Sequence, residues 1–163
     1  MTPEVSRPLA LDRVGSAGIT TLVQADPAEL LAVAARLGVP AVQSLRCEFR
    51  LRRIGGIVEA YGTLTASLTQ QCVVSLDDFD SVMQENFAVH FVPVGTEDEE
   101  PEPDVPDQIP FEGSMIDLGE AMVEQLALSL DPYPRRPGAE LPAEALEPEQ
   151  GAFAALASLR TRQ

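Results

Sequence analysis

Few side chains in this sequence of 163 residues have the chemistry of a catalytic base or nucleophile. The single histidine, His90, stands in an alternating run, which places it on the strand face opposite Phe87, Val89 and Phe91. A catalytic base needs a nucleophile and an orienting group within reach, and the sequence nominates neither. We therefore predict no catalytic residue and no enzymatic activity.

The two cysteines, Cys47 and Cys72, are predicted to be reduced thiols. Cys47 falls on the apolar side of an alternating segment, where a small buried side chain is expected. Zinc needs about four nitrogen or sulfur ligands at short spacing, and two distant cysteines with one histidine do not supply them. The aspartates of residues 77–80 lack the spacing and the central glycine of a calcium loop. The sequence therefore predicts no metal site and no cofactor.

Cationic side chains gather at two places, and the first is one face of a predicted strand. This cluster consists of Arg46, Arg50 and Arg52, with Arg53 following them. The second and weaker place is the pair Arg135-Arg136. Either could contact phosphates, but Glu48 sits inside the first cluster and no aromatic platform accompanies it. A solvated strand face is the favoured interpretation, and an RNA-binding site is the alternative.

The formal net charge of −15 comes from one part of the chain. Between Arg53 and Arg135 there are 17 of the 26 acidic residues and no cation, whereas the remaining residues carry a net charge of +2. The densest acidic run consists of Glu97, Asp98, Glu99, Glu100, Glu102 and Asp104. A field of this sign repels nucleic-acid phosphates and attracts basic proteins. Solubility alone is the simpler explanation, and a surface that binds a basic partner is the functional one.

The elements that carry these side chains are expected to form a single α+β domain over residues 1–160. A mainly antiparallel sheet with about three packed helices accounts for the pattern. Period-two alternation and turn residues predict strands at residues 8–14, 19–23, 44–52, 57–71 and 82–92. The first helix begins after Asp26, which can form a capping box with Glu29, and it ends at Gly38.

The second half of the chain alternates irregular and helical segments. Residues 95–110 are acidic and proline-rich, so we expect a flexible loop there. Asp117 is predicted to cap a second helix, with Glu120 three residues further on. Residues 131–148 should be extended, and a third helix is predicted over residues 149–159. No apolar run approaches the roughly 20 residues that cross a bilayer, and the N-terminal residues lack a signal-peptide pattern. We therefore expect a cytoplasmic location and no membrane partner.

The order of these segments resembles the YceD family, whose members are linked to accumulation of large-subunit ribosomal RNA. The matching stretches are Gly62–Leu76, Phe87–Pro93, Ile116–Leu128 and Phe153–Leu159. The family-motif residues are Gln71, Cys72, Asp117, Glu120 and Glu124. Many members carry Cys-x-x-Cys where this chain has Cys72-Val73-Val74-Ser75, and some carry further cysteines where it has Asp131–Arg135. Any metal site of those relatives is therefore not expected here.

The resemblance implies a non-enzymatic ribosome-biogenesis factor that supports accumulation of large-subunit (23S) ribosomal RNA. Together with the charge distribution, it suggests that the acidic half binds a basic ribosomal protein or assembly factor. The alternative is direct binding of ribosomal RNA through the arginine cluster at residues 46–53. A small metal-dependent enzyme is a third interpretation, and no small-molecule substrate is expected.

Overall fold

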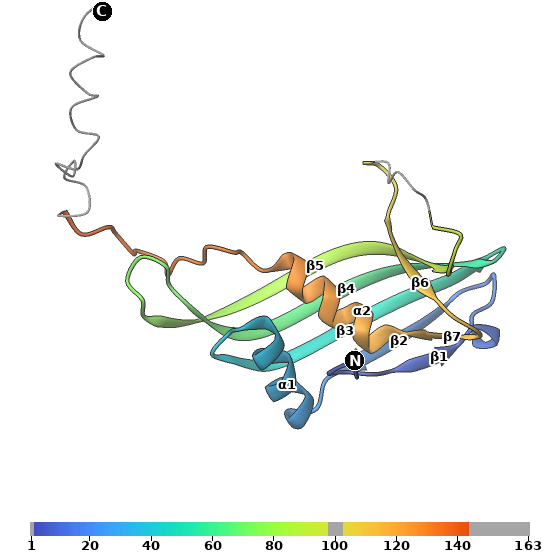
Figure 1. Ribbon diagram of the computed structural model, residues 1–163, viewed down its shortest axis with the longest axis horizontal. Coiled ribbons are helices and arrows are strands. Elements are labelled where there is room, and N and C mark those ends of the chain that lie inside the picture. The colour runs from blue at the N-terminus through green and yellow to red at the C-terminus, as the bar shows by residue number, and fades with distance from the viewer. Residues whose placement is uncertain (1, 98–102, 144–163) are drawn as a thin grey trace, which may run out of the picture.

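The computed structural model describes residues 2–97 and 103–143, which form a twisted five-stranded sheet with helices on one face (Figure 1). The strand order is β2-β3-β4-β5-β6, and a separate two-stranded sheet pairs β1 with β7. The strands are β1 (Pro8–Ala10), β2 (Ile19–Gln24), β3 (Ala41–Ile54), β4 (Ile57–Gln71), β5 (Asp78–Pro93), β6 (Asp107–Phe111) and β7 (Met115–Asp117). Neighbouring strands are antiparallel, except that β6 runs parallel to β5.

Alternating side chains explain why the central strands are long and why only one face of the sheet is covered. In β3 the side chains of Leu45, Cys47, Phe49 and Leu51 are buried, while the residues between them are exposed. In β4 the same alternation buries Leu64, Ala66 and Leu68 opposite them. The predicted strand faces are confirmed, and the predicted antiparallel pairing holds for every pair except β5–β6.

Two α-helices, α1 (Pro27–Leu37) and α2 (Leu118–Ser129), pack on the apolar face of the sheet (Figure 1). The predicted capping box of α1 is present, because Asp26 accepts hydrogen bonds from two helix N–H groups and Glu29 accepts one from Asp26. The helix ends at Gly38, whose φ of 65° is left-handed and therefore suits glycine. Buried side chains of α2, among them Met122 and Leu126, complete the core.

The structure departs from the predicted elements in three places. The strand predicted over residues 8–14 is shorter, because only Pro8–Ala10 forms β1 and a 3-10 turn follows it. Of about three predicted helices, the described residues contain two α-helices and a single 3-10 turn, η1 (Leu11–Arg13), and the predicted helix over residues 149–159 lies outside those residues. The segment predicted as a loop over residues 95–110 is shorter, because β6 begins at Asp107. Alternating Ile109 and Phe111 pack against the core, which draws this segment into the sheet.

Two further predictions concern the proline-rich segment after α2 and the ability of the helices to span a membrane. The segment over residues 131–148 was predicted to be extended because it is rich in proline. Residues 131–142 of it form no helix or strand, in agreement with this prediction, and residues 144–148 lie outside the described residues. Across the ranges 2–97 and 103–143, neither helix is both long and apolar enough to cross a bilayer.

Gly62 lies between two aromatic rings that meet across β4. Phe49 on β3 and Phe87 on β5 are both opposite Gly62, and their ring centroids are 5.8 Å apart in an edge-to-face arrangement. A Cβ atom at Gly62 would lie 2.2 Å from the Phe87 ring. The glycine is therefore required by the close approach of the ring.

We expect Gly62→Ala to lower the free energy of unfolding by about 2 kcal/mol, since overpacked cores typically lose 1–3 kcal/mol. Urea unfolding would measure the change. In a Phe87→Ala background the same substitution should cost little, because the atoms that the new Cβ meets are gone. An equal cost in both backgrounds would contradict this explanation.

Candidate functional site

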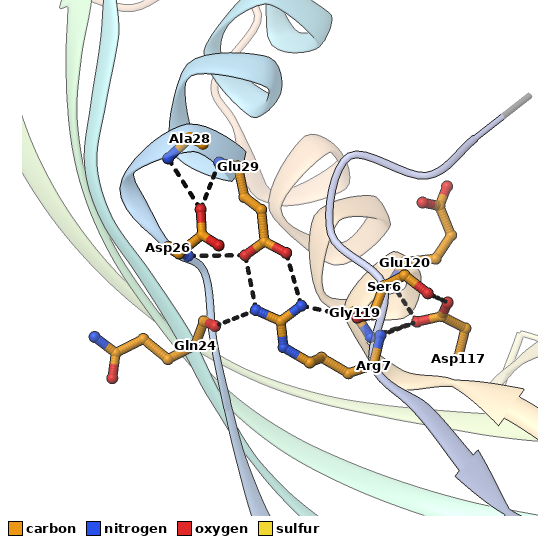
Figure 2. Close-up of polar contacts among 9 residues, drawn as sticks. All are labelled: Ser6, Arg7, Gln24, Asp26, Ala28, Glu29, Asp117, Gly119 and Glu120. Carbon is orange, nitrogen blue, oxygen red and sulfur yellow. Dashed lines mark hydrogen bonds and ion pairs between the residues drawn. The ribbon is translucent and has the colours of Figure 1, made fainter.

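The carboxylate of Asp117 holds two distant parts of the chain together at the start of α2 (Figure 2). Its Oδ1 atom accepts hydrogen bonds from the N–H groups of Gly119 at 2.9 Å and Glu120 at 3.2 Å, as predicted for a helix cap. The same atom accepts the N–H of Arg7 at 2.8 Å, and Oδ2 accepts the hydroxyl of Ser6. Asp117 therefore caps α2 and fixes the N-terminal segment to it.

The guanidinium group of Arg7 extends this network to α1. It donates two hydrogen bonds of 2.7 Å to the two carboxylate oxygens of Glu29, and others to the carbonyl oxygens of Ser6 and Gln24 (Figure 2). Hydrogen bonding to Arg7 lowers the pKa of Glu29 below its usual range. We call Ser6, Arg7, Glu29 and Asp117 the N-terminal latch.

The other two acidic family-motif residues lie on the next turns of α2. Glu120 pairs with Arg36 at 2.9 Å, and Arg36 also pairs with Glu4 at 2.6 Å. The Oε2 atom of Glu120 is buried and accepts no hydrogen bond from the described residues. Burial, followed by the charge of Glu120, raises the pKa of Glu124. Both side chains line a groove between α2 and β6 whose apolar wall includes Ile109 and Phe111.

Cys72 begins the turn that joins β4 to β5, and the proline-rich segment after α2 packs against this turn. The N–H of Cys72 donates to the Asp77 carbonyl at 2.8 Å, and the N–H of Val73 donates to the Pro134 carbonyl at 2.9 Å. Arg136 approaches Asp77 at 3.5 Å. The side chain of Gln71, the adjacent family-motif residue, donates to the Leu76 carbonyl at 3.2 Å.

The donors around Cys72 suit a thiolate and do not suit a zinc ion. Hydrogen bonds from the Ser75 side chain, the Ser75 N–H and the Arg136 N–H lower the pKa of Cys72 to about 6. Cys72 is covered from solvent but lies outside the main core, so these hydrogen bonds outweigh its desolvation. Zinc would need about four sulfur or nitrogen ligands. Ser75 stands three residues after Cys72, where a Cys-x-x-Cys pair would need its second cysteine, and no three metal-ligating side chains gather within the described residues.

The two cysteines should therefore titrate far apart. We expect thiolate absorbance to appear with a midpoint near pH 6 from Cys72, whereas burial raises the pKa of Cys47 to about 12. Since the folded-state pKa of Cys72 is below its unfolded value of 9.0, its contribution to stability is complete above pH 9 and is lost as pH falls through 6. Cys72→Ser should remove the signal near pH 6, and a signal that persists would refute the assignment.

The predicted arginine cluster is divided between two sides of the sheet. Arg46, Arg50 and Arg52 are exposed on the outer face of β3, and Arg52 pairs with Glu59 on β4 at 2.7 Å. Arg53, the next residue, points to the opposite face and donates to the Leu11 carbonyl at 3.4 Å. Arg135 and Arg136 lie near the β4–β5 turn instead. The six predicted cations therefore do not form a single patch.

The acidic residues of the chain's middle, in contrast, follow one edge of the sheet. We call this the acidic edge, and its described members on β5, β6 and the adjoining loops are Asp78, Asp80, Glu85, Glu97, Asp104, Asp107 and Glu112. None of these seven forms an ion pair with a described residue. Asp77, in the turn next to Asp78, is paired with Arg136, and Glu59 and Glu120 are also paired with arginines. Four predicted acidic residues of the run, Asp98, Glu99, Glu100 and Glu102, lie outside the described residues.

Sequence reasoning missed Arg7, Arg36 and β6. Arg7 meets Asp117 across 110 positions, and no local pattern marks such a partner. The same holds for the pair of Arg36 with Glu120, which lies 84 positions further on. The alternation of Ile109 and Phe111 was the available signal for β6, but Pro110 and the acidic surroundings obscured it.

Comparison with known proteins agrees with the resemblance noted from the sequence. A family model described as "Large ribosomal RNA subunit accumulation protein YceD" matches residues 60–159, which are 100 of the 163 residues. No curated protein and no solved structure matches the chain. The matched range runs from β4 through the capped helix α2 and includes Gln71, Cys72 and Asp117. The chain therefore belongs to the YceD family of large ribosomal RNA subunit accumulation proteins.

Proposed function

We propose that this protein is a non-enzymatic ribosome-biogenesis factor that acts in the bacterial cytoplasm and binds a basic ribosomal protein or assembly partner. The family description supports a role in accumulation of large-subunit ribosomal RNA. A factor that holds a basic protein until it meets its RNA would contribute to that accumulation. The acidic edge is the observation that carries the proposed binding.

The charge of the acidic edge supports a basic partner over a nucleic acid. Residues 78–112 contain 11 acidic side chains and neither lysine nor arginine. Because the described members form no internal ion pair, their charges are available to a partner. Complementary fields speed encounter and reject like-charged competitors, and a phosphate backbone would be repelled.

Direct RNA binding is the second candidate, and one juxtaposition on the outer face of the sheet favours it. It corrects the expectation that no aromatic side chain accompanies the arginine cluster. Arg50 on β3 lies directly opposite Tyr61 on β4, and the Tyr61 ring is exposed. An exposed ring beside an arginine offers both a stacking surface and a phosphate contact. Glu48 and Glu59 offset the cations on this face, which is why we rank RNA second.

Affinity capture from the native host, with and without nuclease, separates the two candidates. A basic protein that is recovered after nuclease treatment and released by high salt is the expected result. The matched variant Arg46→Ala/Arg50→Ala/Arg52→Ala should leave this capture unchanged. Loss of all captured material on nuclease treatment, or loss in the arginine variant, would support the RNA candidate instead.

A further inference from the structure

The edge of β5 is open along most of its length. β6 pairs only with Val89–Pro93, so the preceding residues Asp78–Ala88 have β4 on one side and no strand on the other within the described residues. In a β-strand, successive residues direct their N–H and C=O groups to opposite sides. Every second residue of Asp78–Ala88 therefore presents a hydrogen-bond donor and acceptor outward.

The protection that this edge carries against strand addition is negative charge, which would not oppose a basic strand. Natural edge strands are protected by charged side chains, proline, a bulge, a short length or a covering segment. Asp78–Ala88 contains no proline and no lysine, and its register with β4 is continuous from Gln71↔Asp78 to Val58↔Phe91. Val82, near the middle, is 77% exposed. The edge is thus long, regular and accessible.

The charge of the edge identifies the kind of strand that would fit. Asp78, Asp80 and Glu85 give this stretch three negative charges and no positive one. A second copy of this chain would bring the same negative charges to the edge, and like charges on adjacent strands are destabilising. Asp78 and Asp80 lie on the outer face of the sheet, whereas Glu85 lies opposite the buried Leu64 and so belongs to the other face. An extended segment with alternating basic side chains would pair with the backbone and place its cations beside Asp78 and Asp80.

We propose that Asp78–Ala88 of β5 binds an extended basic segment of a partner protein by β-strand addition. The proposal deepens the proposed function, on which it rests, by naming the site on the acidic edge and the conformation of the partner. Main-chain hydrogen bonds would supply affinity, and the carboxylates would select for arginine and lysine.

A ten-residue peptide in which arginine alternates with threonine or valine is a suitable probe. We expect it to protect amides of Asp78–Ala88 from hydrogen exchange when it binds the full chain. The N–H groups of the arginines point to one side of such a strand, and those of the threonines and valines point to the other. Two control peptides therefore keep every side chain and carry N-methyl groups, one on the arginine nitrogens and the other on the threonine and valine nitrogens. In either register one of these controls lacks the donors that face β5, and it should bind at least tenfold more weakly. Equal binding of all three peptides would overturn strand addition.

Charge-neutral variants test the site itself. Asp78→Asn/Asp80→Asn/Glu85→Gln should weaken the first peptide at least tenfold. Asp12→Asn/Glu48→Gln/Glu140→Gln neutralises three exposed carboxylates elsewhere and should change binding less than twofold. Equal loss of binding in both variants would overturn the proposal. It would also be overturned if the amides of Asp78–Ala88 were already protected from hydrogen exchange in the free protein, by another part of the chain or by a second copy.

Capture from the host distinguishes this inference from the function on which it rests. If a basic protein is recovered equally by the wild type and by Asp78→Asn/Asp80→Asn/Glu85→Gln, the β5 site is wrong and the proposed function stands. If neither recovers a basic protein, the proposed function itself fails.

Discussion

Replacing Asp117 with alanine should lower the free energy of unfolding by about 3 kcal/mol. Loss of a helix N-cap costs about 1 kcal/mol, and a partly buried N–H left without an acceptor, as at Arg7, costs about 1–3 kcal/mol more. The substitution also releases the Ser6 hydroxyl. Urea unfolding followed by circular dichroism would measure the loss.

Asp26→Ala is the matched control for this prediction. Asp26 caps α1 through two N–H groups of its own helix, and its side chain accepts no hydrogen bond from a distant segment among residues 2–97 and 103–143. We expect it to cost only about 1 kcal/mol. Asp117→Asn keeps an acceptor in place and should fall between wild type and alanine. Equal costs for Asp26→Ala and Asp117→Ala would show that Asp117 is a helix cap and nothing more.

Gly119→Ala should also destabilise the protein, although alanine is the better helix former. A Cβ atom at this position would lie 2.6 Å from the Val5 carbonyl oxygen and 2.9 Å from the Arg7 nitrogen. Both are backbone atoms of a segment that the N-terminal latch holds, so neither can move away without breaking it. We expect a net loss of about 2 kcal/mol. Gly119 is the second residue of α2, so alanine gains less there than the roughly 1 kcal/mol that it brings to a helix interior.

A double substitution shows whether Gly119 and Asp117 serve the same contact. Each single change should detach residues 5–7 from α2, so the combined loss should be clearly smaller than the sum of the two. Hydrogen exchange at the Arg7 amide would report the detachment directly. Full additivity, or a more stable Gly119→Ala protein, would contradict the described packing.

The parts of the fold that sequence could predict are those set by neighbours in the chain. Strands β3 and β4 were predicted from alternation, because each buried residue has polar residues on either side of it. The caps at Asp26 and Asp117 were predicted because a cap and its N–H donors lie within three residues. β6 was missed because it is five residues long, contains Pro110 and joins the sheet in parallel, a pairing without a local turn signal.

Only part of the candidate site could be predicted from the sequence. The acidic excess was visible in the composition, but its position along one sheet edge depends on the strand order, which places β5 and β6 beyond β4. The roles of Arg7 and Arg36 depend on contacts between residues 22 to 110 positions apart and could not be inferred from local patterns. Strict alternation separates Arg53 from Arg52, so their division between two faces could have been predicted.

The strand order also bears on whether residues 60–159, the range that the family model matches, could fold without the rest of the chain. The matched range starts inside β4, yet β3 pairs with β4 along thirteen positions, from Ala41↔Thr69 to Ile54↔Ile57. A fragment that begins at residue 60 would lose the buried ring of Phe49 and would leave the apolar side of β4 without its neighbour. We therefore expect the shared segment not to fold without the residues that precede it, because they supply the neighbouring strand and part of its core.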